Sequence, residues 1–161
     1  MSSCCSCLKA KAPLSCALCS ESLCKDCAHF IDESNYPYLP LFLEKINLGT
    51  QCPTCFQKNT AGSLQKYEEV LEKARNTEVF YRRTDGKETR LMRRLEPALR
   101  ADNCNDEEDV LMSLAFQAAQ KGSTIVVDIE VSSEKTKNGS YTTVLWKGSG
   151  SAAVRPNRGD S

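Results

Sequence analysis

Hydrophobic residues recur along the chain at two spacings, and each spacing predicts a type of secondary structure. Leu64, Tyr67 and Leu71 lie three or four residues apart, which is typical of the apolar face of a helix. Ser63 is a suitable N-cap for this helix. The pattern predicts a helical connector over residues 61–78.

A second helix is predicted further along the chain. Val110, Leu114 and Ala118 share the helical spacing and follow Asn105 and an acidic run at residues 106–109. Acidic side chains favour a helix N-terminus, where they interact with the helix dipole and cap free amides. Gly122 is expected to end this helix.

Strict alternation of apolar and polar residues predicts a half-buried antiparallel strand over residues 124–132. Its buried face is expected to carry Ile125, Val127, Ile129 and Val131. Asn138-Gly139 has the composition of a hairpin turn, so a return strand is expected from Tyr141 onward.

The segment before the second helix is less regular. Residues 79–83 have the composition of a strand, and Asp85-Gly86 indicates a turn. Residues 89–95 fit either a return strand or one face of a helix.

Together these elements predict a compact α+β domain with the order β-β-α-β-β over residues 79–154, followed by a flexible tail over residues 155–161. A sheet of this size commonly gains core by pairing with another copy, because a small domain buries little apolar surface. A homo-oligomer is therefore expected.

Composition excludes several classes of protein. The chain has 161 residues, of which 40% are hydrophobic, and its 21 basic residues balance its 21 acidic ones. No apolar run approaches the roughly 20 residues of a membrane-spanning helix. The first residues also lack the charged-then-apolar plan of a secretory signal. We expect a cytoplasmic protein with no membrane partner.

Cysteine is the most informative residue type. Eight of the 10 cysteines form four Cys-x-x-Cys pairs within the first 55 residues: Cys4/Cys7, Cys16/Cys19, Cys24/Cys27 and Cys52/Cys55. Each pair directs two thiolates toward one point, which is half of a tetrahedral zinc site. A redox motif or a disulfide framework is the alternative. Four pairs in succession favour two Cys₄ zinc sites.

The gaps between the pairs resemble those of the cross-brace zinc fingers, which include RING, PHD and FYVE domains. The resemblance implies a finger domain over residues 1–60 that binds two Zn²⁺ ions, with alternate pairs sharing an ion. The implied ligands are Cys4, Cys7, Cys24 and Cys27 at one site and Cys16, Cys19, Cys52 and Cys55 at the other.

The finger subtype stays open. Residues 16–27 resemble the middle of a FYVE finger, but the basic cluster that would bind a phosphoinositide is absent. Residues 51–55 resemble the last pair of a RING, which implies E3 ubiquitin ligase activity as an alternative function. His29, two residues after Cys27, and Cys5, inside the first pair, are alternative ligands.

Two further segments are candidate interaction sites. The apolar segment between the third and fourth pairs is expected either to pack over the zinc sites or to bind a protein partner through Tyr36, Tyr38, Leu41 and Phe42. Residues 79–101 carry seven basic and three acidic residues. They predict either a solvated strand face or a nucleic-acid site formed by Arg82, Arg83, Arg93 and Arg94.

Residues 118–127 and 148–154 resemble a family of small bacterial proteins assigned to heavy-metal binding, which form ring-like homo-oligomers. No cysteine or histidine lies in these residues, so metal binding is expected only near the N-terminus. No catalytic constellation is visible in the sequence. We therefore expect a non-enzymatic zinc-binding adaptor with a C-terminal domain for oligomerisation or partner binding.

Overall fold

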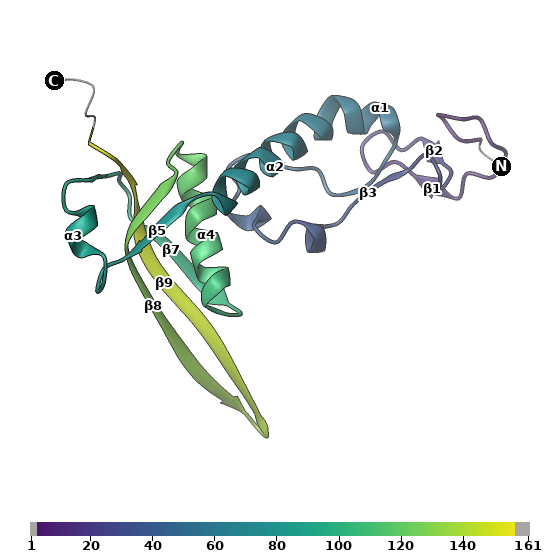
Figure 1. The fold of residues 1–161 in the computed structure, drawn as a ribbon. Helices are drawn as coiled ribbons and strands as arrows, with labels where there is room; N and C mark the ends of the chain where they lie inside the picture. The colour runs from purple at the N-terminus through teal and green to yellow at the C-terminus, as the bar shows by residue number, and fades with distance from the viewer. Residues whose placement is uncertain (1–2, 157–161) are drawn as a thin grey trace. The chain divides into compact units, whose positions relative to one another are not determined.

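The computed structural model describes residues 3–156, and the chain divides into two compact units, residues 1–68 and 69–161. Figure 1 shows the elements of both units. Most of the predicted tail lies outside the described residues, and only Arg155 and Pro156 are described. Within the described part of the chain, no helix is both long enough and apolar enough to cross a bilayer.

The N-terminal unit contains little regular structure before its helix. Its short strands pair antiparallel, β1 (Leu14–Ser15) with β2 (Ser22–Leu23) and β3 (His29–Ile31) with β4 (Gly49–Gln51). Two 3₁₀ turns, η1 (Glu33–Asn35) and η2 (Leu39–Leu41), lie between β3 and β4. The fully buried cluster around the cysteines contains a single aliphatic residue, Leu23, and four cysteines.

A continuous helical segment follows β4. It comprises α1 (Pro53–Cys55), the π-helical turn η3 (Phe56–Thr60) and α2 (Ala61–Arg75). Pro53 occupies the first turn and the Cys52 Sγ accepts a hydrogen bond from the Cys55 amide, so the helix begins ten residues before the predicted N-cap. The prediction that Ser63 caps this helix is therefore wrong.

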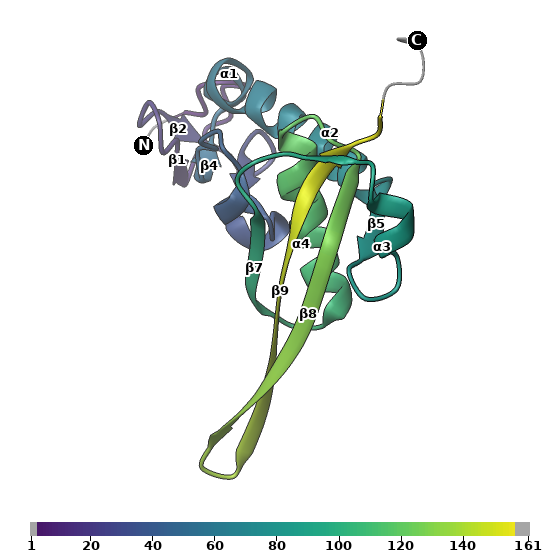
Figure 2. The ribbon, with the colours of Figure 1, turned by 90° about the vertical axis from the view of Figure 1, so that its left-hand side faces the viewer.

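The C-terminal unit is a five-stranded mixed sheet with one long helix packed on it. The strands are β5 (Glu78–Tyr81), β6 (Arg93–Arg94), β7 (Leu99–Cys104), β8 (Ile125–Asn138) and β9 (Tyr141–Val154). β8 pairs in parallel with β5 and antiparallel with β9, whose other edge pairs with β6 and β7. Figure 2 shows α4 (Glu107–Gln120) lying against one face of this sheet.

Two clusters of apolar side chains lie on opposite faces of the sheet. Val110, Leu114 and Ala118 of α4 pack against one face, where they meet Leu99, Ala101, Val126, Ile129 and Ala152. Met92 packs with the second cluster, which contains Phe80, Ile125, Val127 and Ala153. The sheet is thus covered on both faces near the start of β8.

A β-bulge at Asp128 changes which face the β8 side chains occupy. Asp128 has φ of 56°, and β8 uses one more residue than β9 between Val127 and Glu130. Val127 belongs to the cluster with Met92, whereas Ile129 belongs to the cluster with α4. The prediction that Ile125, Val127, Ile129 and Val131 share one face is wrong, because the extra residue reverses the alternation.

The predicted order of elements is correct only in part. The helix after the acidic run and the final hairpin are confirmed, with Asp106 as N-cap of α4 and Gly122 at φ of 81° just after its end. The hairpin expected at Asp85-Gly86 is wrong. There the Asp85 carboxylate accepts a hydrogen bond from the Tyr81 amide, and the short helix α3 (Gly86–Thr89) begins. The observed order is β-α-β-β-α-β-β.

Gly148 tests the close contact between α4 and the sheet. A Cβ atom at this position would lie 2.5 Å from Val110 Cγ1 and 2.9 Å from the Glu130 carbonyl oxygen. We expect Gly148→Ala to lower the free energy of unfolding by about 1–3 kcal/mol, because the helix must shift. Gly86→Ala is the control, since nothing lies within 4 Å of its added methyl group. Equal thermal shifts for both variants would contradict this packing.

Candidate metal centre

The first group of thiols joins the loop before β1 to the segment after β2. The Sγ atoms of Cys4, Cys7, Cys24 and Cys27 all lie within 4.8 Å of one another. The Cys7 and Cys24 Sγ atoms are 3.5 Å apart. Cys4 and Cys24 are buried, whereas Cys7 is exposed and Cys27 half-buried.

The second group joins the turn between β1 and β2 to the start of α1. The Sγ atoms of Cys16, Cys19, Cys52 and Cys55 lie within the same 4.8 Å limit. The Cys19 and Cys52 Sγ atoms are 3.8 Å apart. The first and third pairs thus form one group and the second and fourth pairs form the other, which is the interleaved arrangement of the cross-brace resemblance.

The spacing of the thiols can be compared with that of a metal site. Sulfur atoms around a tetrahedral zinc ion lie about 3.8 Å apart, because the Zn–S bond is about 2.3 Å long. The measured separations of 3.5 and 3.8 Å are close to this value. Both groups can therefore hold a metal ion with little movement of the chain.

The first two cysteine pairs are built in the same way. The Cys4 carbonyl accepts a hydrogen bond from the Leu8 amide, and the Cys16 carbonyl accepts one from the Ser20 amide. Leu8 and Ser20 follow the second cysteine of each pair and have φ of 65° and 66°. Left-handed backbone is unfavourable for such residues, so these two positions are held by the turns around them.

Backbone amides donate to the first sulfur of each of these two pairs. The Ser6 amide donates to Cys4 Sγ and the Leu18 amide to Cys16 Sγ, each at 3.4 Å. The Cys52 amide also donates to Cys16 Sγ at 3.4 Å. Such donors favour the thiolate, which is the form that binds a metal.

In each group, one buried thiol and one half-buried thiol hold their protons unequally. Amide donors, those of Cys7 and Cys24 foremost, lower the pKa of Cys4 to about 6. Burial opposes the shift at Cys16, but amide donors outweigh it and its pKa is also about 6. Hydrogen bonds with neighbouring thiols raise the pKa of Cys27 and Cys55 to about 12. A metal bound by all four sulfurs must therefore displace protons, so acid weakens its binding.

The two alternative ligands lie outside both groups. The His29 ring stacks on the Phe56 ring, with centroids 4.1 Å apart. Cys5 is exposed and lies between the two cysteines of the first pair. Within the described residues, neither side chain belongs to a cluster of metal-ligating groups.

The apolar segment between the third and fourth pairs packs on the helix. The rings of Tyr36 and Phe42 meet the Tyr67 ring edge-on, with centroids 5.3 and 5.4 Å away. The Tyr38 amide donates a hydrogen bond to the Tyr67 hydroxyl at 3.1 Å, and Leu41 is half-buried. The cluster around the cysteines contains none of these residues, so the segment packs on α2 rather than over the thiols.

The candidate nucleic-acid arginines have different surroundings. Arg94 uses all five of its N–H donors inside the protein, on the Asp128 carboxylate, the Thr89 and Met92 carbonyls and the Thr89 hydroxyl. Arg82 pairs with Glu130 at 3.2 Å. Arg83 and Arg93 are exposed. Arg94 therefore has no donor left for a phosphate.

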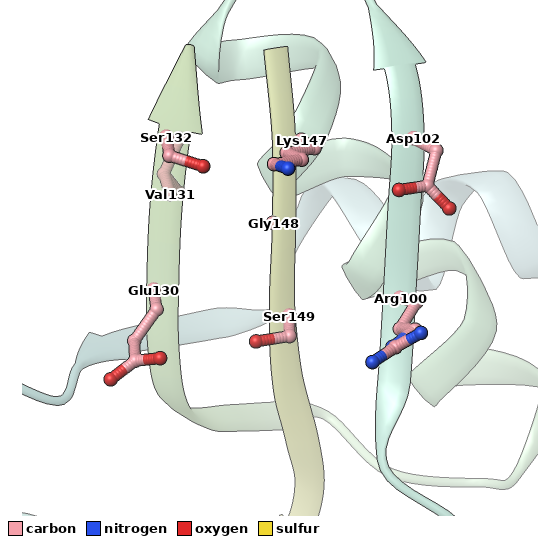
Figure 3. A pocket seen from close by; sticks show the side chains of 8 residues that line it. All are labelled: Arg100, Asp102, Glu130, Val131, Ser132, Lys147, Gly148 and Ser149. Carbon is pink, nitrogen blue, oxygen red and sulfur yellow. The ribbon is translucent and has the colours of Figure 1, made fainter. Parts of the chain in front are cut away.

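A hollow on the polar face of the sheet contains charged residues that sequence analysis did not single out. Figure 3 shows Arg100 and Lys147 together with Asp102 and Glu130 around it. Two cations and two carboxylates balance, so this hollow lacks the excess positive charge of a nucleic-acid site. Its residues come from three adjacent strands, of which β8 and β9 form the predicted hairpin and β7 was not predicted from the sequence.

Comparison of the chain with protein-family models, with curated proteins and with solved structures finds no match. The finger subtype and the ubiquitin-ligase alternative therefore stay predictions. What the geometry establishes is the presence of two groups of four cysteines that can each hold a metal ion.

The ion pair of Arg94 with Asp128 gives a test that depends on pH. Arg94 lowers the pKa of the Asp128 carboxyl below its usual value. The contribution of this ion pair to stability is therefore complete above the unfolded-state pKa of Asp128, about 4. It is lost as the pH falls through the lower pKa that Asp128 has in the folded state. Asp128→Asn, which tolerates the same backbone conformation, should lower the free energy of unfolding at neutral pH by about 1 kcal/mol after allowance for solvent screening.

Chemical denaturation at several pH values measures this loss. The difference between the variant and the parent chain should shrink below about pH 4. Glu130→Gln is the matched control, because it removes only the exposed ion pair with Arg82, which contributes little. A loss at Asp128 that does not change with pH would contradict the assignment.

Proposed function

We propose that the chain is a non-enzymatic, zinc-dependent interaction protein. Each group of four cysteines holds one structural Zn²⁺ ion, and the C-terminal unit oligomerises or binds a second partner. The observation that carries this proposal is the donor set, since each cluster consists of four thiols within 4.8 Å of one another. Four cysteine ligands are typical of a structural site, because they leave no coordination position for substrate.

The residues of the N-terminal unit support a structural role for the metal. The cluster around the thiols contains Leu23 as its single fully buried aliphatic side chain. With so little buried apolar surface around the thiols, packing alone stabilises these loops only weakly. A metal ion in each group would link chain segments that are far apart in the sequence, and binding of the metal would be coupled to folding.

The surface proposed for the partner lies beside β3. Tyr36, Pro37, Leu39 and Pro40 line a hollow together with Asp32 and Glu33. Apolar side chains beside two carboxylates favour a peptide that combines apolar residues with lysine or arginine. Tyr38, Leu41 and Phe42 belong to the same segment and are half-buried, so they support this surface from within.

Single cysteine substitutions test the metal sites. Cys24→Ser should remove about one equivalent of zinc per chain, measured by elemental analysis, because the first group loses a buried ligand. It should also expose the amides of the N-terminal unit to hydrogen exchange, because folding there depends on the metal. Cys5→Ser is the matched control, since Cys5 lies in the same segment but outside both groups. Equal zinc content in the two variants would refute the proposal.

A further inference from the structure

The hairpin of β8 and β9 extends well beyond the rest of the sheet. Figures 1 and 2 both show the two strands continuing past α4 and β7 as a two-stranded ribbon. The last residue of β7 that pairs with β9 is Cys104, opposite Trp146. Residues 132–144 are all exposed. An uncovered two-stranded ribbon is only marginally stable in water, so this ribbon lacks the cover that would hold its shape.

The outer edge of β9 on this ribbon is free of charge. Within the described residues, residues 141–145 pair with β8 on one side and with no strand on the other. Their sequence is Tyr-Thr-Thr-Val-Leu, in which every residue is aromatic, β-branched or aliphatic. Tyr141 is 77% exposed and Val144 is 38% exposed. An uncharged edge of this kind is a template for pairing with another strand.

The outer edge of β8 is different, because charged residues occupy it. Self-pairing centred on Glu134 would put two carboxylates opposite each other, and pairing centred on Lys135 would oppose two ammonium groups. Pairing centred on Thr136 would place Lys135 opposite Lys137. Like charges directly opposite each other destabilise a sheet, and edge lysines are a common block to such pairing. Charge therefore opposes self-pairing in these three registers of the β8 edge, whereas the β9 edge carries no charge over residues 141–145.

We propose that two copies of this chain join edge to edge through β9, antiparallel, with the two-fold axis at Thr143. In this register Tyr141 lies opposite Leu145 of the second copy, and Thr142 lies opposite its Val144. Thr143 lies opposite itself. Both ribbons then form one four-stranded sheet, in which an aromatic–aliphatic pair and a β-branched pair meet across the new edge.

Two constraints select this register. A two-fold axis perpendicular to a sheet pairs residues that point to the same face. One residue must therefore lie directly opposite its own copy, with the axis midway between the two. The free edge is limited at one end by the hairpin turn and at the other by β7, which already occupies the position beside Trp146. Residues 141–145 fill this edge and Thr143 is their centre. This inference rests on the oligomerisation role proposed above for the C-terminal unit, and it does not require metal.

Charge placed on the two-fold axis tests the proposal in the full-length chain. Analytical ultracentrifugation from micromolar to roughly millimolar concentration should give a dimer for the unmodified chain. Thr143→Lys and Thr143→Glu should each weaken the dimer about tenfold or more, because each opposes two like charges. An equal mixture of the two variants should restore it, because lysine then faces glutamate. Thr136→Lys is the control, since Thr136 lies opposite Thr143 on β8 and adds the same charge away from the axis.

Three results would overturn the proposal. These are a monomer throughout the concentration range, a dimer that persists in Thr143→Lys, and a Thr136→Lys variant that dissociates as readily as Thr143→Lys. Restoration by the mixed variants shows that each variant is folded. The zinc content of the same samples reports on the cysteine groups separately, so an unmodified chain that stays monomeric but retains its zinc counts against the ribbon contact alone.

Discussion

The fold of the N-terminal unit depends on two groups of four thiols, each of which brings together cysteines that are widely separated along the chain. Most of the buried side chains around them end in sulfur, and the four strands are only two or three residues long. Hydrogen bonds between such short strands cannot hold the loops by themselves. The position of each loop therefore follows from its cysteines, and an ion in each group would compensate for the small apolar cluster around the thiols.

The C-terminal unit depends instead on close packing, and one irregularity organises it. The bulge at Asp128 turns Val127 toward one face of the sheet and Ile129 toward the other. Arg94 holds the Asp128 carboxylate with two donors at 2.9 and 3.1 Å. The same side chain fixes the end of α3 through the Thr89 carbonyl. Arg94, which the sequence predicts as a nucleic-acid contact, instead holds the bulge of β8 in place.

Sequence patterns predict the local features of this protein better than the non-local ones. The grouping of cysteines, helix α4 and the hairpin after Asn138 depend on residues close together or on a spacing with a specific chemical meaning. β7 was missed because its sequence, Leu-Arg-Ala-Asp-Asn-Cys, is mostly polar and small. The parallel pairing of β5 with β8 joins segments more than 40 residues apart. The bulge leaves the alternation of residue types unchanged, so nothing in the pattern marks the reversal of faces.

If the interleaved thiols form two closed metal sites, the mass of the intact chain under native conditions reports the bound ions directly. We expect two zinc ions per untagged chain at neutral pH, and we expect both ions to be released in acid as the thiolates regain their protons. One zinc ion per chain, or none after expression with ample zinc, would contradict the two closed sites and would favour redox chemistry at the Cys-x-x-Cys pairs.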